Sequence, residues 1–253
     1  MDRASLSWLR VDLYGSMPAL PDLDAIFSLG PLDGLANWLI QARFGAQPRL
    51  IALSSMSLLS KRDSTDAGER ALAMRLENSE KSVIAAADSR GLDWTLLRPT
   101  LIYGAGLDRS LTPLARFGVR WRLFPHLPAA RGLRQPVHAE DLAAACMRLL
   151  SCPDAIGRIY PVGGGERLTF GRMLESVRLS LPVRVLPVPL SLGMLRMAAG
   201  SLRLFGREWS AAAAFARLNS DQIADNDAAR TDFGWTPRAF RPDVSCWVPP
   251  ALP

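Results

Sequence analysis

The feature that most constrains the fold is an apolar run that ends in a proline. Residues 94–97 have the sequence Trp-Thr-Leu-Leu and lead directly into Arg-Pro-Thr-Leu-Ile-Tyr-Gly at residues 98–104. A short unbroken apolar run is typical of a strand buried on both faces of a parallel sheet. The proline fixes φ where this strand ends. We therefore expect residues 94–97 to form a central, buried strand of a parallel α/β sheet.

Helical and strand patterns alternate around this run, as the crossovers of a parallel sheet require. Further strands are predicted over residues 8–13, 24–29, 49–54, 159–162 and 183–186. Helices are predicted over residues 32–44, 67–89, 111–117 and 139–150, and from residue 169 onward. Residues 60–66 and 121–128 are expected to be loops, and the chain after residue 186 is expected to be helical except for turns.

The composition suits one domain with a small appended lobe. The chain has 253 residues, of which 49% are hydrophobic, so it can bury a full core. Its 30 Lys and Arg residues outnumber 24 Asp and Glu residues, for a net charge of +6. Because the basic residues lie singly between apolar positions, they predict solvated surface and no nucleic-acid-binding stripe. Anionic small ligands remain compatible with the excess charge.

The cysteines and the most apolar segments bear on the cellular compartment and on membrane insertion. Cys146, Cys152 and Cys246 match no metal-ligand spacing, and three is an odd number for a disulfide framework. This favours a reducing cytoplasm. With two histidines in the chain, a zinc site is not expected, and the first residues lack the apolar core of a signal peptide. Prolines and arginines interrupt residues 186–206, which predicts no spanning helix but leaves docking on a partner or a membrane surface open.

Further motifs follow the strand at residue 94. They are Gln-Pro-Val-His at residues 135–138, Gly-Gly-Gly-Glu at residues 163–166 and Phe-Gly-Trp-Thr-Pro at residues 233–237. In this order and spacing the chain resembles the extended short-chain dehydrogenase/reductase superfamily, in particular its NAD-dependent epimerase/dehydratase family, which acts on nucleotide sugars. The resemblance implies a Rossmann-like NAD(P)-binding core over residues 1–132. Residues 133–253 would then hold the remaining core elements, interleaved with a small C-terminal substrate lobe.

Two parts of the family pattern are missing from the chain. The family opens with a glycine-rich strand-turn-helix that holds the cofactor pyrophosphate, whereas the first glycine here is Gly15, which stands alone. The sheet is therefore expected to be N-terminally incomplete, without its first βα unit, and to bind NAD or NADP weakly or not at all. The Tyr and Lys that relatives carry on the helix before residue 94 fall near Ala73 and Glu77, which cannot perform their acid/base chemistry.

The resemblance assigns cofactor contacts to the ends of the predicted strands. Two short segments occupy the places where relatives contact adenine and ribose, and glycine lets backbone approach a ligand closely. The turn after residue 98 would form a wall of the nicotinamide pocket. The cofactor-binding candidates are Asp12, Leu13, Leu29, Gly30, Pro31, Pro99 and Ile102.

Ser54 and Ser55 end a predicted strand at the edge where open α/β sheets bind ligands. By position they inherit the family's role of holding the reacting hydroxyl or carbonyl, although serines also cap strands and begin turns. Tyr103 is assigned to a pocket wall and Arg134 to a substrate phosphate. His138 is expected to be architectural, and Glu77 with Lys81 to form an exposed helical ion pair.

Two functions stay open at this point. One is an NAD(P)-dependent epimerase, dehydratase or reductase on a nucleotide sugar or similar small molecule, atypical or weakly active without the Tyr/Lys pair. The other is a non-catalytic, cofactor-binding scaffold, regulator or assembly protein, or an interaction domain without a dinucleotide. Without its first strand, the sheet should have an edge that is exposed or covered by residues 1–6, and exposed edges invite association, so a homo-oligomer is possible.

Overall fold

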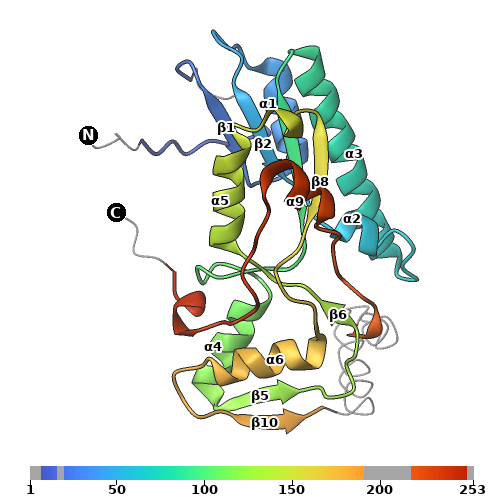
Figure 1. Ribbon diagram of the computed structural model, residues 1–253, viewed down its shortest axis with the longest axis vertical. Helices are drawn as coiled ribbons and strands as arrows, with labels where there is room; N and C mark the ends of the chain where they lie inside the picture. The colour runs from blue at the N-terminus through green and yellow to red at the C-terminus, as the bar shows by residue number, and fades with distance from the viewer. Residues whose placement is uncertain (1–6, 16–19, 191–217, 250–253) are drawn as a thin grey trace.

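The computed structural model describes residues 7–15, 20–190 and 218–249, and its centre is a four-stranded parallel sheet (Figure 1). The strands are β1 (Ala25–Ser28), β2 (Arg49–Leu53), β3 (Trp94–Pro99) and β8 (Arg158–Val162), in the order β1-β2-β3-β8. The predicted run at residue 94 pairs with β2 on one side and β8 on the other. Leu96 and Leu97 are fully buried, so the predictions of a parallel sheet and of a central, buried strand are confirmed.

Helices cover both faces of this sheet. Leu50 and Leu96 pack with buried side chains of α1 (Leu32–Gln41) and α3 (Ala67–Ser89). Their strand neighbours Ile51 and Leu97 belong to a second core with α5 (Ala139–Leu149) and α9 (Asp227–Phe233). Successive residues of a strand point to opposite faces, which is why apolar residues stand next to each other in the middle of β2 and β3.

A second lobe lies beyond the carboxyl edge of the sheet, at the lower end in Figure 1. It contains α4 (Leu111–Trp121), α6 (Phe170–Leu179) and the parallel pair β5 (Leu123–His126) and β10 (Leu186–Pro189). These elements share a third apolar core. Two short strand pairs, β4 (Ile102–Tyr103) with β7 (Val137–His138) and β6 (Leu133–Arg134) with β9 (Leu168–Thr169), lie between the lobe and the sheet. Short helices are α2 (Ser57–Ser60), η1 (Pro153–Ala155) and η2 (Val244–Trp247).

Several predicted elements differ in the structure. Residues 8–13 form no strand: they are irregular, and Trp8 is 76% exposed, because no described strand lies beside them to pair with. The loop predicted at residues 121–128 contains β5, and its partner β10 begins at Leu186, where the predicted strand was to end. After residue 218 the chain is mostly irregular apart from α9 and η2, and the predicted helical residues 191–217 lie outside the described part.

The sheet has one edge with a single neighbour. Among the described residues β1 pairs with β2 alone. Residues 1–6, which were predicted as a possible cover of this edge, are outside the described residues. Within the described residues, no helix has the length and apolar character needed to cross a bilayer.

Candidate functional site

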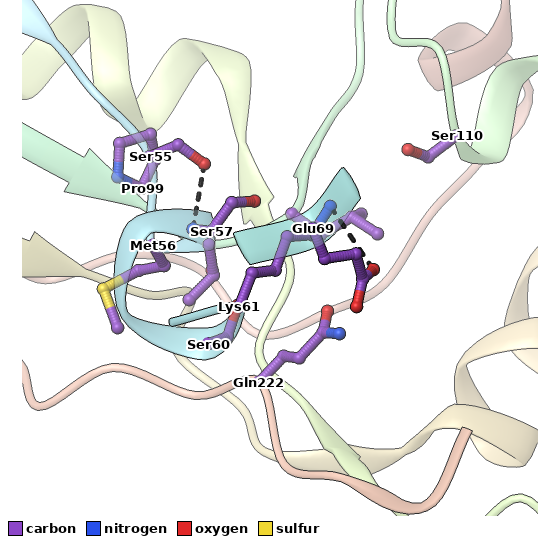
Figure 2. A pocket seen from close by; sticks show the side chains of 11 residues that line it. Ser55, Met56, Ser57, Ser60, Lys61, Glu69, Pro99, Ser110 and Gln222 are labelled. Atoms are coloured by element: carbon purple, nitrogen blue, oxygen red, sulfur yellow. Dashed lines mark hydrogen bonds and ion pairs between the residues drawn. The ribbon is translucent and has the colours of Figure 1, made fainter. Parts of the chain in front are cut away.

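A cavity of about 290 Å³ opens at the carboxyl ends of β2 and β3 (Figure 2). Open α/β sheets bind their ligands at this edge, where helices begin and loops converge. Backbone hydrogen bonds continue the two strands into the cavity wall, from Ser54 N to Leu97 O (2.7 Å) and from Met56 N to Pro99 O (3.0 Å). The lining residues are Ser55, Met56, Ser57, Ser60, Lys61, Glu69, Pro99, Thr100, Leu101, Ser110 and Gln222.

Ser54 does not line this cavity, because its hydroxyl donates a hydrogen bond to Glu80 on α3. The Glu80 side chain is 3% exposed and also accepts two hydrogen bonds from Arg98, at 2.9 Å from Nε and 2.5 Å from Nη2. This is the fork-to-carboxylate geometry that makes arginine pairs strong. The arginine of the Arg-Pro motif therefore ties α3 to the strand ends, and Ser54 belongs to the same buried network.

Ser55 occupies the position predicted for a substrate-holding hydroxyl and lines the cavity. Its Oγ accepts a hydrogen bond from Ser57 N at 3.1 Å, which begins α2. Such local side-chain-to-backbone bonds are why serines favour helix starts. Figure 2 shows Ser55 beside Pro99, so the two strand ends each contribute a predicted residue to one wall.

Two charged groups line the cavity, one from the end of α2 and one from the first turn of α3. Lys61 Nζ lies 3.7 Å from Glu69 Oε1, and Ser64 Oγ donates a hydrogen bond to Glu69 Oε2 at 2.6 Å. The Glu69 side chain is 9% exposed and that of Lys61 25% exposed. Helix α3 begins here because Asp66 caps it, accepting a hydrogen bond from Glu69 N. The cavity therefore has an ion-paired ammonium and carboxylate in its lining, in addition to the Ser55 hydroxyl.

Gln222 reaches the same cavity from the C-terminal part of the chain (Figure 2). Its backbone donates to Leu133 O at 2.8 Å and forms a parallel bridge with Arg134. The buried Arg134 guanidinium donates to Ser220 O at 2.8 Å and lies over the Phe170 ring, and burial lowers its pKa. Arg134, predicted to bind a substrate phosphate, therefore holds the segment that carries Gln222 and does not itself line the cavity.

Two of the predicted residues lie in the packing between sheet and lobe. Ile102 is half-buried against the second core. Tyr103 is 1% exposed and contacts the His138 and Phe240 rings edge to face, and burial raises its pKa. His138 caps α5 by accepting a hydrogen bond from Glu140 N at 3.2 Å, as the architectural interpretation requires.

The remaining cofactor-binding candidates gather at the start of α1. Asp12 accepts a hydrogen bond from Tyr14 N, and the Tyr14 hydroxyl donates to Asp33 Oδ1 at 2.8 Å. Leu13 packs so closely on Gly34 that a Cβ there would lie 2.9 Å from the Leu13 Cβ. The turn at residues 12–14 is thereby held beside α1, which begins directly after the exposed residues 29–31.

Gly30 has open space around it, with no atom within 4 Å of a Cβ placed there. Its backbone is therefore free for close approach by a ligand at the end of β1. Residues 29–31 and 54–55 and Pro99 follow three adjacent strands, so they share the carboxyl edge of the sheet. No glycine-rich turn follows β1, β2 or β3 among the described residues. The glycines at residues 163–165 follow β8 at the same edge, but their backbone N–H groups already donate to Asn226 Oδ1, Gln135 O and Arg238 O.

The positions to which the resemblance assigns an acid/base pair carry other interactions. Ala73 is buried in the packing of α3. The exposed Glu77 carboxylate pairs with Lys81 at 2.9 Å and with Arg62 at 3.3 Å, and these cations lower its pKa. The predicted ion pair between Glu77 and Lys81 is thus present.

Sequence reasoning did not identify four residues that build the site: Lys61, Glu69, Glu80 and Gln222. Lys61 lies in a segment that its polar composition marks as a loop, and Glu69 and Glu80 lie among many helix-forming charges. Gln222 joins the site across more than a hundred residues of chain. In the described part of the chain no cluster of His, Cys, Asp and Glu has the arrangement of a metal site.

Comparisons with known proteins agree with this architecture, although no family model matches the chain. The UDP-glucose 4-epimerase of Vibrio cholerae is 22% identical over 215 residues, which cover 81% of this chain and 63% of that protein. Subunit 9 of the NADH dehydrogenase [ubiquinone] 1 alpha subcomplex, mitochondrial, of Dictyostelium discoideum is 26% identical over 83 residues, or 33% of this chain and 23% of that protein. The structure of RMD from Pseudomonas aeruginosa, complexed with NADPH, superposes with a TM-score of 0.63 at 17% identity, covering 91% of this chain and 82% of that one.

The chain spans less than two thirds of the length of the curated relatives it matches. At these identities the similarity establishes the fold, and the motifs predicted the same one. The chain therefore has the Rossmann-like fold of the NAD-dependent epimerase/dehydratase family of extended short-chain dehydrogenases/reductases.

Proposed function

We propose that this chain is an atypical NAD(P)-dependent epimerase/dehydratase-family protein that binds a nicotinamide dinucleotide weakly and a nucleotide sugar or similar small molecule. The observation that carries the proposal is the cavity at the carboxyl edge, which Ser55, Lys61, Glu69 and Pro99 line. Its place in the fold matches the ligand-binding edge of open α/β sheets. The curated relative that acts on UDP-glucose and the NADPH-bound structure supply the ligand classes.

The residues present fit one half of the dinucleotide better than the other. The open backbone at Gly30 and the wall at Pro99 suit a ribose and a nicotinamide ring. When bound, the cofactor would accept or supply a hydride. The pyrophosphate lacks its glycine turn among the described residues, and each hydrogen bond to a charged group is worth about 1.5–3 kcal/mol. Losing two such bonds weakens binding by roughly two to four orders of magnitude.

In this proposal Ser55 orients a substrate hydroxyl or carbonyl, and the Lys61–Glu69 pair that lines the same cavity supplies groups that can move a proton. A serine without a base beside it positions a ligand and is not a nucleophile. Activity would be weak because Ala73 has no ionisable group and Glu77 is committed to two cations. Loss of a general acid/base typically lowers a rate about 100- to 10,000-fold.

Calorimetric titration with NAD(H), NADP(H) and UDP-glucose, combined with a hydride-transfer assay, tests this proposal. We expect dinucleotide affinity weaker than micromolar and slow turnover. Ser55→Ala, Lys61→Met and Glu69→Gln should lower ligand binding or turnover. Lys81→Met and Glu77→Gln are matched controls, because they neutralise an exposed ion pair on the same helix. Micromolar or tighter NAD binding would contradict the weak-cofactor claim, and equal effects of the two pairs of variants would exclude a role for the cavity.

A second candidate is a non-catalytic, cofactor-binding scaffold, regulator or assembly protein. It is favoured by the placement of Ala73 and Glu77 in structural roles and by the similarity to a subunit of the NADH dehydrogenase complex. This candidate predicts that NADP(H) or NAD(H) raises the unfolding temperature with no turnover on any nucleotide sugar. Turnover that Lys61→Met abolishes would exclude it.

A further inference from the structure

The lobe carries an exposed apolar surface at the end farthest from the sheet. Trp121 is 58% exposed, Leu179 is 69% exposed and Leu186 is 68% exposed. Leu123 is 42% exposed and is the direct register partner of Leu186. Isolated exposed leucines are ordinary, whereas large apolar side chains gathered at one place mark an interaction surface.

These residues lie together because four elements meet at one corner. Helices α4 and α6 end there, and β5 and β10 begin there (Figure 1). Leu186 N donates to Arg122 O at 2.9 Å, and Arg178 at the end of α6 donates to Val185 O at 3.1 Å. The alternate residues Phe124 and Val185 are buried in the lobe core, which turns Leu123 and Leu186 outward. We call this surface the lobe tip; it consists of Arg120, Trp121, Arg122, Leu123, Leu179 and Leu186.

The charge around the lobe tip has one sign. Residues 111–139 and 176–190, which include the elements that meet at the lobe tip, contain no acidic residue, and the arginines nearest to the tip in sequence are Arg120, Arg122, Arg178 and Arg184. Arg120 and Arg122 flank Trp121, and the Arg120 guanidinium lies 5.4 Å from the centre of its ring. The nearest acidic residue in sequence on α6, Glu175, is paired with Arg178 at 2.5 Å. The lobe tip is therefore apolar at its centre and cationic around it.

We propose that the lobe tip docks on an anionic lipid bilayer surface, with Trp121 and the leucines entering the headgroup region and the arginines contacting lipid phosphates. Tryptophan favours this interface, because its ring is apolar and its N–H is polar. Arginine can bury its stem while its guanidinium stays with the headgroups. Apolar insertion and cationic attraction together give the two contributions that peripheral membrane binding needs.

Other occupants fit the surface less well. A nucleic acid would meet the arginines but would gain nothing from three exposed leucines. A protein partner would have to offer a concave face that is both acidic and apolar. An anionic bilayer supplies negative charge and apolar chains over its whole surface. This inference does not depend on the proposed function, because the lobe tip and the cavity share no residue.

Vesicle co-sedimentation of the full chain tests the proposal, with phosphatidylcholine alone and with an equimolar mixture of phosphatidylcholine and phosphatidylglycerol. We expect binding to the anionic vesicles only, weakened by high salt. Arg120→Gln with Arg122→Asn should weaken it roughly thirtyfold, at about one kcal/mol per arginine. Asn is chosen because Arg122 has a φ of 58°, which Asn tolerates. Trp121→Ser with Leu186→Ser should weaken binding at least about tenfold.

Ile40→Ser with Arg43→Gln is the matched control. It removes one exposed apolar and one exposed basic side chain near the end of α1, at the opposite end of the molecule (Figure 1), and should bind as the unaltered chain does. Equal binding to neutral vesicles, no binding to either, or equal loss in the control would each overturn the proposal. So would a concentration-dependent dimer, seen by analytical ultracentrifugation, that both lobe-tip variants abolish, or RNA binding that they abolish.

Discussion

Glu80→Ala is expected to be strongly destabilising, because it removes the carboxylate that joins α3 to the ends of two strands. The variant leaves Arg98, which is 19% exposed, without its bidentate partner, and it also frees the Ser54 hydroxyl. Removing one partner of a buried pair costs about 3–5 kcal/mol. Because Arg98 keeps some access to water, we take about 3 kcal/mol, which corresponds to a fall of about 6–12 °C in the unfolding temperature for a chain of this size.

Thermal unfolding followed by circular dichroism measures this fall. Glu77→Ala is the matched control, since it makes the same change on the same helix at an exposed pair, so helix propensity cancels and the unfolding temperature should hardly move. A double-mutant cycle adds Ser54→Ala, which should destabilise the unaltered chain more than the Glu80→Ala variant. The reasoning is refuted if Glu80→Ala lowers the unfolding temperature no more than Glu77→Ala does.

Two further predictions concern the turn and motif that hold the lobe to the sheet. Burial, and then the charge of Arg238, lower the pKa of His138 in the folded chain. The neutral imidazole therefore contributes its full share to the free energy of unfolding above about pH 6.5, and this contribution is lost as the pH falls below that value. His138→Asn, which keeps a capping side chain, should flatten the decline in unfolding temperature on acidification, and an unchanged decline would exclude this role. Gly164→Ala would place a Cβ 1.8 Å from Pro136 O and should lower the free energy of unfolding, measured in urea, by about 1–3 kcal/mol. Gly30→Ala, whose Cβ would have no atom within 4 Å, should leave it unchanged. Equal urea midpoints for the two variants would contradict the close approach at Gly164.

Much of the sheet region was predictable because its signals are local. Helix α3 begins and ends at the predicted residues, since its helix-forming composition, its Asp66 cap and the left-handed Gly91 after it lie within one stretch of chain. The strand at residue 94 was predictable for the same kind of reason, because a strand buried on both faces is apolar at most of its positions. The Arg-Pro and Gln-Pro-Val-His motifs then predicted the family whose fold the chain has.

Strands that depend on a distant partner were not predictable in this way. Residues 8–13 have the composition of a strand but no described neighbour, and backbone groups without a ladder partner remain with water. Strand β5 forms because β10, about sixty residues later, pairs with it. The sequence of one segment does not show whether a distant segment will pair with it.

The sequence by itself determined the strands and helices of the central parallel sheet and its Rossmann-like fold, and it predicted that ligand contacts lie at the carboxyl edge. The tertiary structure alone decided which side chains meet there. It assigned Ser54 to the Glu80–Arg98 network and Ser55 to the cavity, and it brought Lys61 and Gln222 to the same place. The physical reason is that apolar periodicity is set by burial along one element, whereas the partner of a polar side chain is set by packing between elements far apart in the chain.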